Sequence, residues 1–117
     1  MKTVIEKLLP QAIKLDGKGK YTRLFSTKSG NAFAFRSGHV ILQNRQNIGE
    51  HNTGDAEEII IVLNGKGVLS IDGKDVITFE KETAIYIPPY TLHDIKNTHR
   101  KPLHYVYITC CTGRSQS

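Results

Sequence analysis

Residues 57–79 read EEIIIVLNGKGVLSIDGKDVITF, and this stretch decides the fold class. Three runs rich in apolar and β-branched residues, which favour strands, are separated by turn-forming residues. The first turn is predicted at residues 64–67 and the second at Asp72-Gly73. Because an Asp-Gly pair between two β-prone runs is a strong hairpin signal, we expect antiparallel strands joined by short turns.

The apolar run at positions 59–63 indicates an unusual environment for its strand. A strand with one face in water alternates polar and apolar residues, and this run does not alternate. We therefore expect cover on both faces. One cover is the interior of the domain, and the other is a second sheet, the N-terminal segment or a partner subunit. A chain of this length buries only about two-thirds of its surface unaided, so we expect a homodimer.

Similar β-prone runs occupy most of the remaining chain. They are predicted at residues 21–25, 32–35, 39–43, 57–63, 68–71, 75–79, 83–87, 93–97 and 103–109, with Ser37-Gly38 as a turn. Strands and loops of ordinary length give about nine or ten strands in a chain of this size. No long helical pattern separates these runs, which excludes a parallel α/β sheet. The sequence therefore predicts an all-β fold, an antiparallel sandwich or barrel formed by residues 21–117.

The N-terminal residues have a different pattern. Apolar residues recur at helical spacing from Val4 to Ile13, and Thr3 with Glu6 fits a capping box. Pro10 lies inside this pattern and would end or kink a helix. We expect residues 1–20 to form a separate segment, with a short helix or turn, that packs on the barrel or on a partner.

The composition excludes several other classes of protein. The 117 residues are 38% hydrophobic and 23% charged, as in one soluble domain. No apolar run approaches the roughly 20 residues of a membrane span, and Glu6 and Lys7 interrupt any signal-peptide core. We therefore expect a cytoplasmic protein without a membrane partner.

The net charge of +5 comes from bases scattered among turns without interleaved aromatic residues, so we expect no nucleic-acid partner. The adjacent Cys110 and Cys111 cannot form a disulfide framework.

Residues able to carry chemistry lie in two separate segments. His51 precedes a turn-forming cluster, and Glu58 follows at the start of the apolar strand. If the chain folds back there, His51 and Glu58 stand on neighbouring strands, and Glu58 shares a face with every second residue of its strand. Such a carboxylate is expensive to bury unless a metal ion or a histidine accompanies it. After the turn forced by Pro88-Pro89, His93 opens another strand.

These two segments resemble the paired sequence motifs of the cupin superfamily. The first motif is a glycine, His-x-His, a glutamate and a second glycine, and the second motif is a proline, a glycine, a histidine and an asparagine. The corresponding residues here are Gly49, His51, Thr53, Glu58 and Gly65, followed by Pro88, Tyr90, His93 and Asn97. The resemblance covers residues 33–108. It implies an antiparallel β jelly-roll barrel that holds one divalent metal ion in its mouth.

Carried over residue by residue, the resemblance assigns the metal ligands to His51, Glu58 and His93. Thr53 stands where the family has its second histidine, and a hydroxyl is a poor ligand for transition metals. Two imidazoles and one carboxylate still match the facial triad of non-haem iron enzymes, and they also suit zinc or manganese. The expected cofactor is therefore one divalent ion, Zn, Mn, Fe or Ni.

Four further residues are candidates for the pocket or for the surroundings of the metal: Thr53, Glu57, Tyr90 and Asn97. Glu57 is a replacement ligand only if its strand is irregular, since it otherwise faces away from Glu58. Tyr90 replaces the glycine of the second motif, which would place an aromatic ring near the barrel mouth. Asn97 is expected to bond the backbone around the metal-site turn rather than to take part in catalysis.

The function expected from these residues is that of a small metal-binding cupin that takes a small polar molecule into its barrel, as a metal-dependent isomerase or dioxygenase. The alternative is a non-catalytic binding or sensing protein. Thr53 favours this alternative, because catalytic members generally keep the full ligand set. A hydrogen-bonded polar cluster in a metal-free barrel would place the same three side chains together. The fold alone does not decide among these functions.

Overall fold

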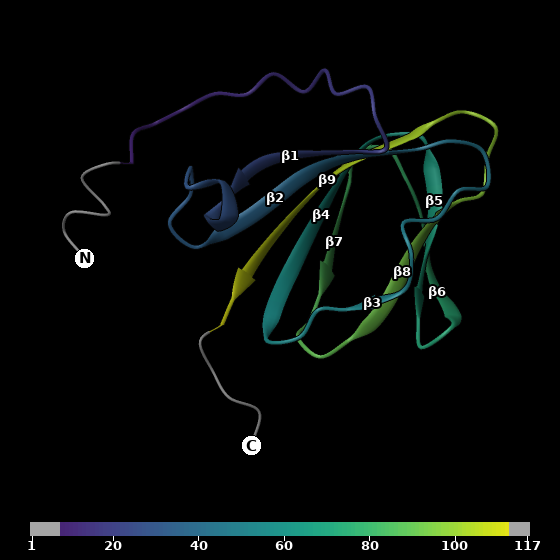
Figure 1. Cartoon of the computed structure of the whole chain (residues 1–117). Coiled ribbons are helices and arrows are strands. Elements are labelled where there is room, and N and C mark those ends of the chain that lie inside the picture. Colours follow the sequence, from purple (N-terminus) through teal and green to yellow (C-terminus); the bar gives the residue numbers. More distant parts are fainter. Residues whose placement is uncertain (1–7, 113–117) are drawn as a thin grey trace.

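Two antiparallel sheets make up the computed structural model, which describes residues 8–112 (Figure 1). One sheet has the strand order β1-β2-β9-β4-β7 and the other has the order β3-β8-β5-β6. The bounds of the elements are β1 (Tyr21–Ser26), η1 (Thr27–Ser29), β2 (Phe35–Leu42), β3 (His51–Asn52), β4 (Ala56–Asn64), β5 (Lys66–Ile71), β6 (Lys74–Glu80), β7 (Thr83–Ile87), β8 (Leu92–Asn97) and β9 (Leu103–Cys111). The predicted all-β jelly-roll fold is confirmed.

The core lies between the two sheets and is built by period-two alternation. On β4, Ile60 and Val62 are buried, and their neighbours in the register on β9 are the buried Tyr105 and the half-buried Tyr107. The facing sheet contributes apolar residues such as Leu69 from β5. Burial of a side chain of this size stabilises the folded state by roughly 1.5–3 kcal/mol, so the alternating positions of β4 and β9 fix the register of this sheet.

The outer face of β4 is not covered within one chain. Ile59, Ile61 and Leu63 are 45%, 37% and 37% exposed, whereas we expected cover on both faces. Tyr86, which lies opposite Ile59 on β7, is also exposed. The apolar run therefore has one face in the core and one face open in the monomer. The homodimer expected from it stays a prediction.

The turn signals were informative at one site and misleading at another. The hairpin at Asp72-Gly73 is confirmed, and both residues have the positive φ of a type I′ turn, 51° and 78°. The predicted turn at Ser37-Gly38 is wrong, because β2 continues from Phe35 through this pair. Gly38 is needed for space, since an added Cβ would lie 2.5 Å from the Tyr21 ring. The missing Cβ of Gly38 allows the Tyr21 ring to lie close to the backbone of β2, and this glycine does not end a strand.

The N-terminal segment is not helical where the structure describes it. Residues 8–15 contain no helix, and the earlier part of the expected helix lies outside the described residues. Leu9 is 72% exposed, and the Gln11 side chain donates a hydrogen bond to the carbonyl of Asn31. Pro10 disfavours a helix here, because it removes an amide donor and its ring clashes with the preceding turn. No helix between residues 8 and 112 is long and apolar enough to cross a membrane.

Candidate metal centre

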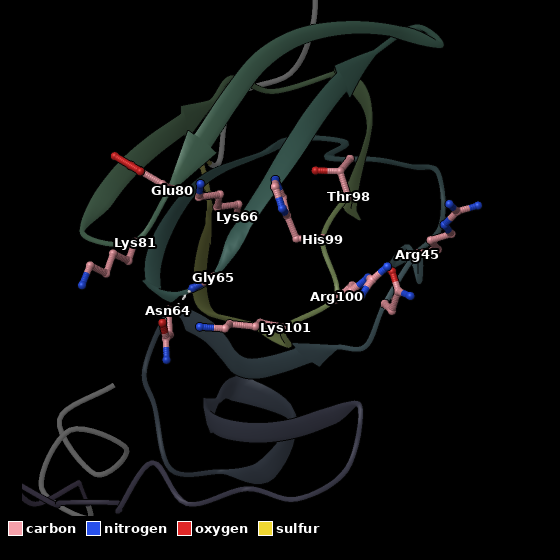
Figure 2. A pocket seen from close by; sticks show the side chains of 11 residues that line it. Arg45, Asn64, Gly65, Lys66, Glu80, Lys81, Thr98, His99, Arg100 and Lys101 are labelled. Atoms are coloured by element: carbon pink, nitrogen blue, oxygen red, sulfur yellow. Dashed lines mark hydrogen bonds between the residues drawn. The ribbon is translucent and has the colours of Figure 1, made fainter.

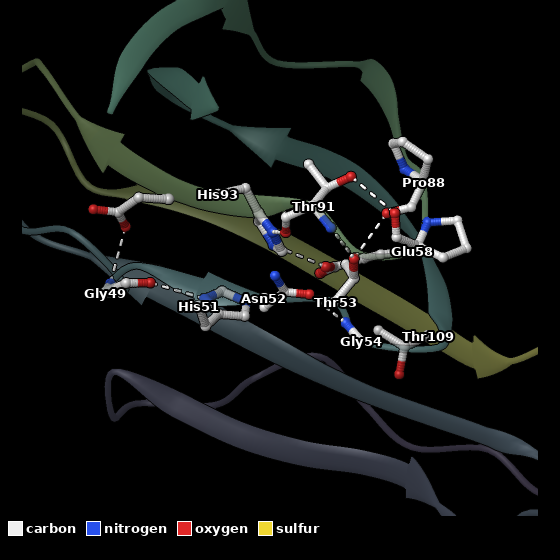
Figure 3. A network of polar contacts seen from close by, with 12 residues as sticks. Gly49, His51, Asn52, Thr53, Gly54, Glu58, Pro88, Thr91, His93 and Thr109 are labelled. Carbon is white, nitrogen blue, oxygen red and sulfur yellow. Dashed lines mark hydrogen bonds and ion pairs between the residues drawn. The ribbon is translucent and has the colours of Figure 1, made fainter. Parts of the chain in front are cut away.

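Three strands bring the predicted ligands together at one end of the sandwich (Figure 3). His51 on β3 lies opposite His93 on β8 in the strand register, and their rings are 4.1 Å apart between centroids. Glu58 lies on the inward face of β4. One ligand atom from each of these three side chains lies within 4.8 Å of the others. We call this group the triad.

The backbone fixes the orientation of both imidazoles. Nδ1 of His51 lies 2.8 Å from the carbonyl oxygen of Gly49, and Nδ1 of His93 lies 2.9 Å from that of Thr91. Because a carbonyl oxygen only accepts, each Nδ1 must carry the proton and donate it. The Nε2 atom of each ring then keeps its lone pair. This is the tautomer in which histidine binds a metal through Nε2.

The contact between His93 and Glu58 fits a site built for a cation. Nε2 of His93 lies 3.1 Å from Oε1 of Glu58, and the two residues are 1% and 6% exposed. This Nε2 has no hydrogen-bond partner of good geometry. Two lone pairs at this separation in a buried place repel each other unless a metal ion or a proton lies between them.

The pKa of His93 also indicates that positive charge is favoured next to the Glu58 carboxylate. Burial lowers this pKa, but the Glu58 carboxylate and the carbonyl of Thr91 outweigh burial, so the net pKa lies above 6.5. The site beside Glu58 therefore favours positive charge. Two imidazole nitrogens and one carboxylate could hold a divalent ion of the Zn, Mn, Fe or Ni group. They leave coordination positions open for a substrate.

The family is established by comparison with known proteins. Residues 38–109 match the family described as Cupin domain, which is more than half of the chain and includes the whole triad. The chain belongs to the cupin family.

A curated relative of this cupin is the glucose-6-phosphate isomerase of Pyrococcus abyssi, which is 30% identical over 91 residues. The match covers 74% of this chain but 43% of that protein, so the cupin spans less than half the length of this relative. A protein of Methanocaldococcus jannaschii is 37% identical over 62 residues, which cover 53% of this chain and 46% of that protein.

Solved structures support the fold alone. The cupin protein of Bacteroides fragilis superposes with a TM-score of 0.72 at 20% identity, and the match covers 95% of this chain and 90% of that chain.

Thr53 does not take the place of the missing second histidine as a ligand. Its hydroxyl donates to the carbonyl of Pro88 at 2.8 Å and accepts from the amide of Thr91 at 3.0 Å. Strand β3 ends one residue earlier, at Asn52, so Thr53 already belongs to the turn. Its role is to connect this turn to the loop between β7 and β8 (Figure 3).

Glu57 and Tyr90 lie away from the triad. Glu57 is on the outer face of β4, where its Oε1 accepts a hydrogen bond from the Tyr86 hydroxyl, and this arrangement matches the predicted alternation. Tyr90 is 42% exposed and is not among the described residues that line the cavity at the triad, so its ring does not extend the site as expected. Its backbone, with φ at 54°, donates to the carbonyl of Gly54 and shapes the turn.

Asn97 stabilises a loop at the other end of the barrel. It follows His93 by four positions on the same face of β8, about 13 Å along the strand. Its amide nitrogen donates to the carbonyls of Leu42 and Lys101, and its oxygen accepts from the amide of His99. The expected structural role is therefore seen in the hydrogen bonds, but around the β8–β9 loop rather than around the metal-site turn.

The cavity at the triad contains further polar residues that the motifs do not mark. It has a volume of about 520 Å³, and its lining includes Glu50, Arg36, Tyr21 and Tyr107. The two tyrosine hydroxyls lie 2.6 Å apart. Burial and the hydrogen bond shared with the Tyr21 hydroxyl raise the pKa of Tyr107, so it stays protonated at neutral pH. Arg36 could have been found by alternation, because it shares the inward face of β2 with the buried Val40.

Proposed function

We propose that this cupin is a metal-dependent isomerase that interconverts the aldose and ketose forms of a small phosphorylated sugar. The observation that carries the proposal is the convergence of two Nε2 lone pairs and a buried carboxylate in a cavity that also contains a cation, Arg36. The position of this cavity at one end of the sandwich leaves it open to small polar molecules.

Each part of the cavity has a defined task in this reaction. When bound by His51, Glu58 and His93, a divalent metal would polarise a carbonyl or hydroxyl oxygen of the sugar. Arg36 would bind the phosphate group, because a guanidinium forms paired hydrogen bonds with phosphate oxygens. Isomerisation moves a proton between neighbouring carbons, which requires a base. Glu50 would be that base, since it is the lining carboxylate outside the triad among the described residues.

The curated relative from Pyrococcus abyssi supports this choice of reaction. It is described as a glucose-6-phosphate isomerase, and its similarity covers 74% of this chain. Likeness of fold does not by itself select a reaction: a structure from Thermotoga maritima with a TM-score of 0.69 is described as a predicted oxalate decarboxylase. That match has 24% identity and covers 91% of this chain and 95% of that chain. The substrate class proposed here therefore rests on the chemistry of the cavity and on the 30% identical relative.

The test is turnover of aldose phosphates by protein loaded separately with Zn, Mn, Fe or Ni, followed by NMR detection of the ketose product. We expect Glu58→Gln to lower kcat/KM by more than about 100-fold, because even residues that only support metal ligands contribute about 10–100-fold. Glu57→Gln removes a neighbouring carboxylate on the outer face and is the matched control, with activity close to the parent.

Two further variants separate binding from chemistry. Arg36→Gln is expected to raise KM more than it lowers kcat, since phosphate is bound equally in ground and transition states. Glu50→Gln is expected to lower kcat while metal binding stays intact. If metal-loaded parent protein converts no aldose phosphate with any of the four metals, the proposed reaction is wrong.

The second candidate function is a binding or sensing cupin without turnover. The observation that favours it is Thr53, whose hydroxyl is engaged by Pro88 and Thr91 and supplies no fourth protein ligand. If the protein has this function, a phosphorylated sugar would bind to the metal-loaded protein and be recovered unchanged. Calorimetry of binding, combined with NMR of the recovered ligand, distinguishes the two functions.

A further inference from the structure

A second cavity lies at the end of the sandwich opposite the triad, because its lining residues are at or beyond the far ends of β4 and β8. Figure 2 shows the side chains that line it. Its volume is about 730 Å³, and it is an open pocket lined by residues in or next to the loops β2–β3, β4–β5, β6–β7 and β8–β9. The last of these loops follows Asn97, which is four positions beyond His93 on β8. The charged residues that line the cavity are Arg45, Lys66, Glu80, Lys81, Arg100 and Lys101. We call it the cationic end pocket.

The pocket concentrates most of the excess charge of the chain. Five cationic side chains against one carboxylate give a lining charge of +4, whereas the whole chain has a net charge of +5. Among residues 8–112, none of these five cations has a carboxylate within the 4.0 Å of an ion pair. Like charges that are gathered from three loops and the start of β5 and left unpaired repel one another and create a strongly positive potential. An anion in the pocket would remove that repulsion.

The walls of the pocket are fixed by buried contacts. Asn97 is fully buried and connects the β8–β9 loop to the end of β2 through the carbonyls of Lys101 and Leu42. Gly65, with φ at 93°, lies so close to this loop that an added Cβ would be 2.6 Å from the carbonyl oxygen of Pro102. Lys66, Arg100 and Lys101 therefore project from backbone that is already held in place, which lowers the entropy cost of binding a ligand.

We propose that the cationic end pocket binds a compact polyanionic small molecule that carries several phosphate groups. The described lining residues include no Phe, Tyr or Trp, so the pocket lacks the stacking surface that single-stranded nucleic acids use. The cations surround a hollow and do not form a stripe, which suits a small ligand of high charge density. This site is independent of the triad and of the isomerase proposal.

The experiment measures binding of inorganic tripolyphosphate to the full chain by calorimetry in 0.15 M salt, a concentration at which long-range charge effects are screened beyond about 8 Å. EDTA is present because tripolyphosphate chelates divalent metals. We expect the parent to bind and the triple variant Arg45→Gln, Arg100→Gln, Lys101→Gln to bind at least tenfold more weakly. The control variant Lys18→Gln, Lys20→Gln, Lys28→Gln loses the same charge outside the pocket and should bind like the parent.

A second variant, Lys66→Gln with Lys81→Gln, removes charge from the opposite walls and should also weaken binding while the thermal unfolding curve stays that of the parent. The proposal is overturned if the parent does not bind, or if the control variant weakens binding as much as the pocket variants do. It is also overturned if a single-stranded oligonucleotide binds more tightly than tripolyphosphate, which would make the pocket part of a nucleic-acid surface.

Discussion

Replacement of Asn97 by alanine tests how the loops around the cationic end pocket are stabilised. The side chain is fully buried and makes three hydrogen bonds to backbone groups, with lengths of 2.9, 2.8 and 2.8 Å to Leu42, Lys101 and His99. Alanine would leave two carbonyls and one amide without these partners. A small void would replace the amide group, in a place where the surrounding strands leave little room to collapse.

The expected loss of stability follows from these three bonds. A typical intramolecular hydrogen bond contributes about 0.5–1.5 kcal/mol, and a buried group left unsatisfied costs about 1–3 kcal/mol. Some of the freed groups lie at the loop and will bond to water, so the total loss of stability is smaller than the sum for three unsatisfied groups. We expect Asn97→Ala to lower the free energy of unfolding by about 3 kcal/mol, a large part of the roughly 5–15 kcal/mol of an ordinary domain.

Urea unfolding followed by circular dichroism measures this change, with an unaltered m-value as the sign that the unfolded state is unchanged. Asn47→Ala is the matched control. Its amide donates to Oδ2 of Asp94 at 2.8 Å but is exposed, so its loss should cost about 0.5 kcal/mol. A loss below about 1 kcal/mol for Asn97→Ala would refute the reasoning. It would mean that the β8–β9 loop is not held by this side chain.

Three further predictions concern the triad, a buried histidine and the outer face. A divalent metal at about 100 times its Kd should stabilise the parent by about 2.7 kcal/mol in thermal unfolding, and His93→Ala should abolish this gain if the triad binds the ion. Burial, with a smaller contribution from His104, lowers the pKa of His39 below 6.5. The unfolded chain then binds the extra proton, so stability should fall as pH drops below about 6.5, and His39→Gln should reduce this slope in pH-dependent urea unfolding. If the open face of β4 forms the homodimer, sedimentation should give a dimer for the parent and a monomer for Ile61→Lys; a monomeric parent would contradict it.

Alternation along single strands accounts for what the sequence predicted well. On β4 it placed Glu58 inward and Glu57 outward, and the structure has both arrangements. Successive side chains of a strand point to opposite faces, so their direction can be predicted from the local sequence wherever the strand is regular. Alternation could not tell whether the outward face of β4 is covered, because cover depends on what packs there from outside the strand.

The missed features depend on contacts between distant segments. The Ser37-Gly38 pair predicts a turn because glycine is common in turns, but Gly38 lies within β2, and its missing Cβ leaves room for the rings of Tyr21 and Tyr107. The basic residues were interpreted as scattered because they are far apart in the chain. The topology of the two sheets brings Lys66 and Arg100 to one cavity, which no local pattern could indicate.

The substitution at Thr53 is explained by the hydrogen bonds of the neighbouring loop. Proline has no amide hydrogen, so the Pro88-Pro89 segment cannot pair as a strand does, and the carbonyl of Pro88 needs a donor. The Thr53 hydroxyl provides it, and the same oxygen accepts from the amide of Thr91. The carbonyl of Thr91 in turn accepts from Nδ1 of His93 and from the amide of Thr53. Without the Thr53 hydroxyl both side-chain bonds would be lost, and Thr91, whose carbonyl orients His93, would be held less firmly. Thr53 thus supplies no ligand atom but helps to position His93, one of the three residues that could hold a metal ion.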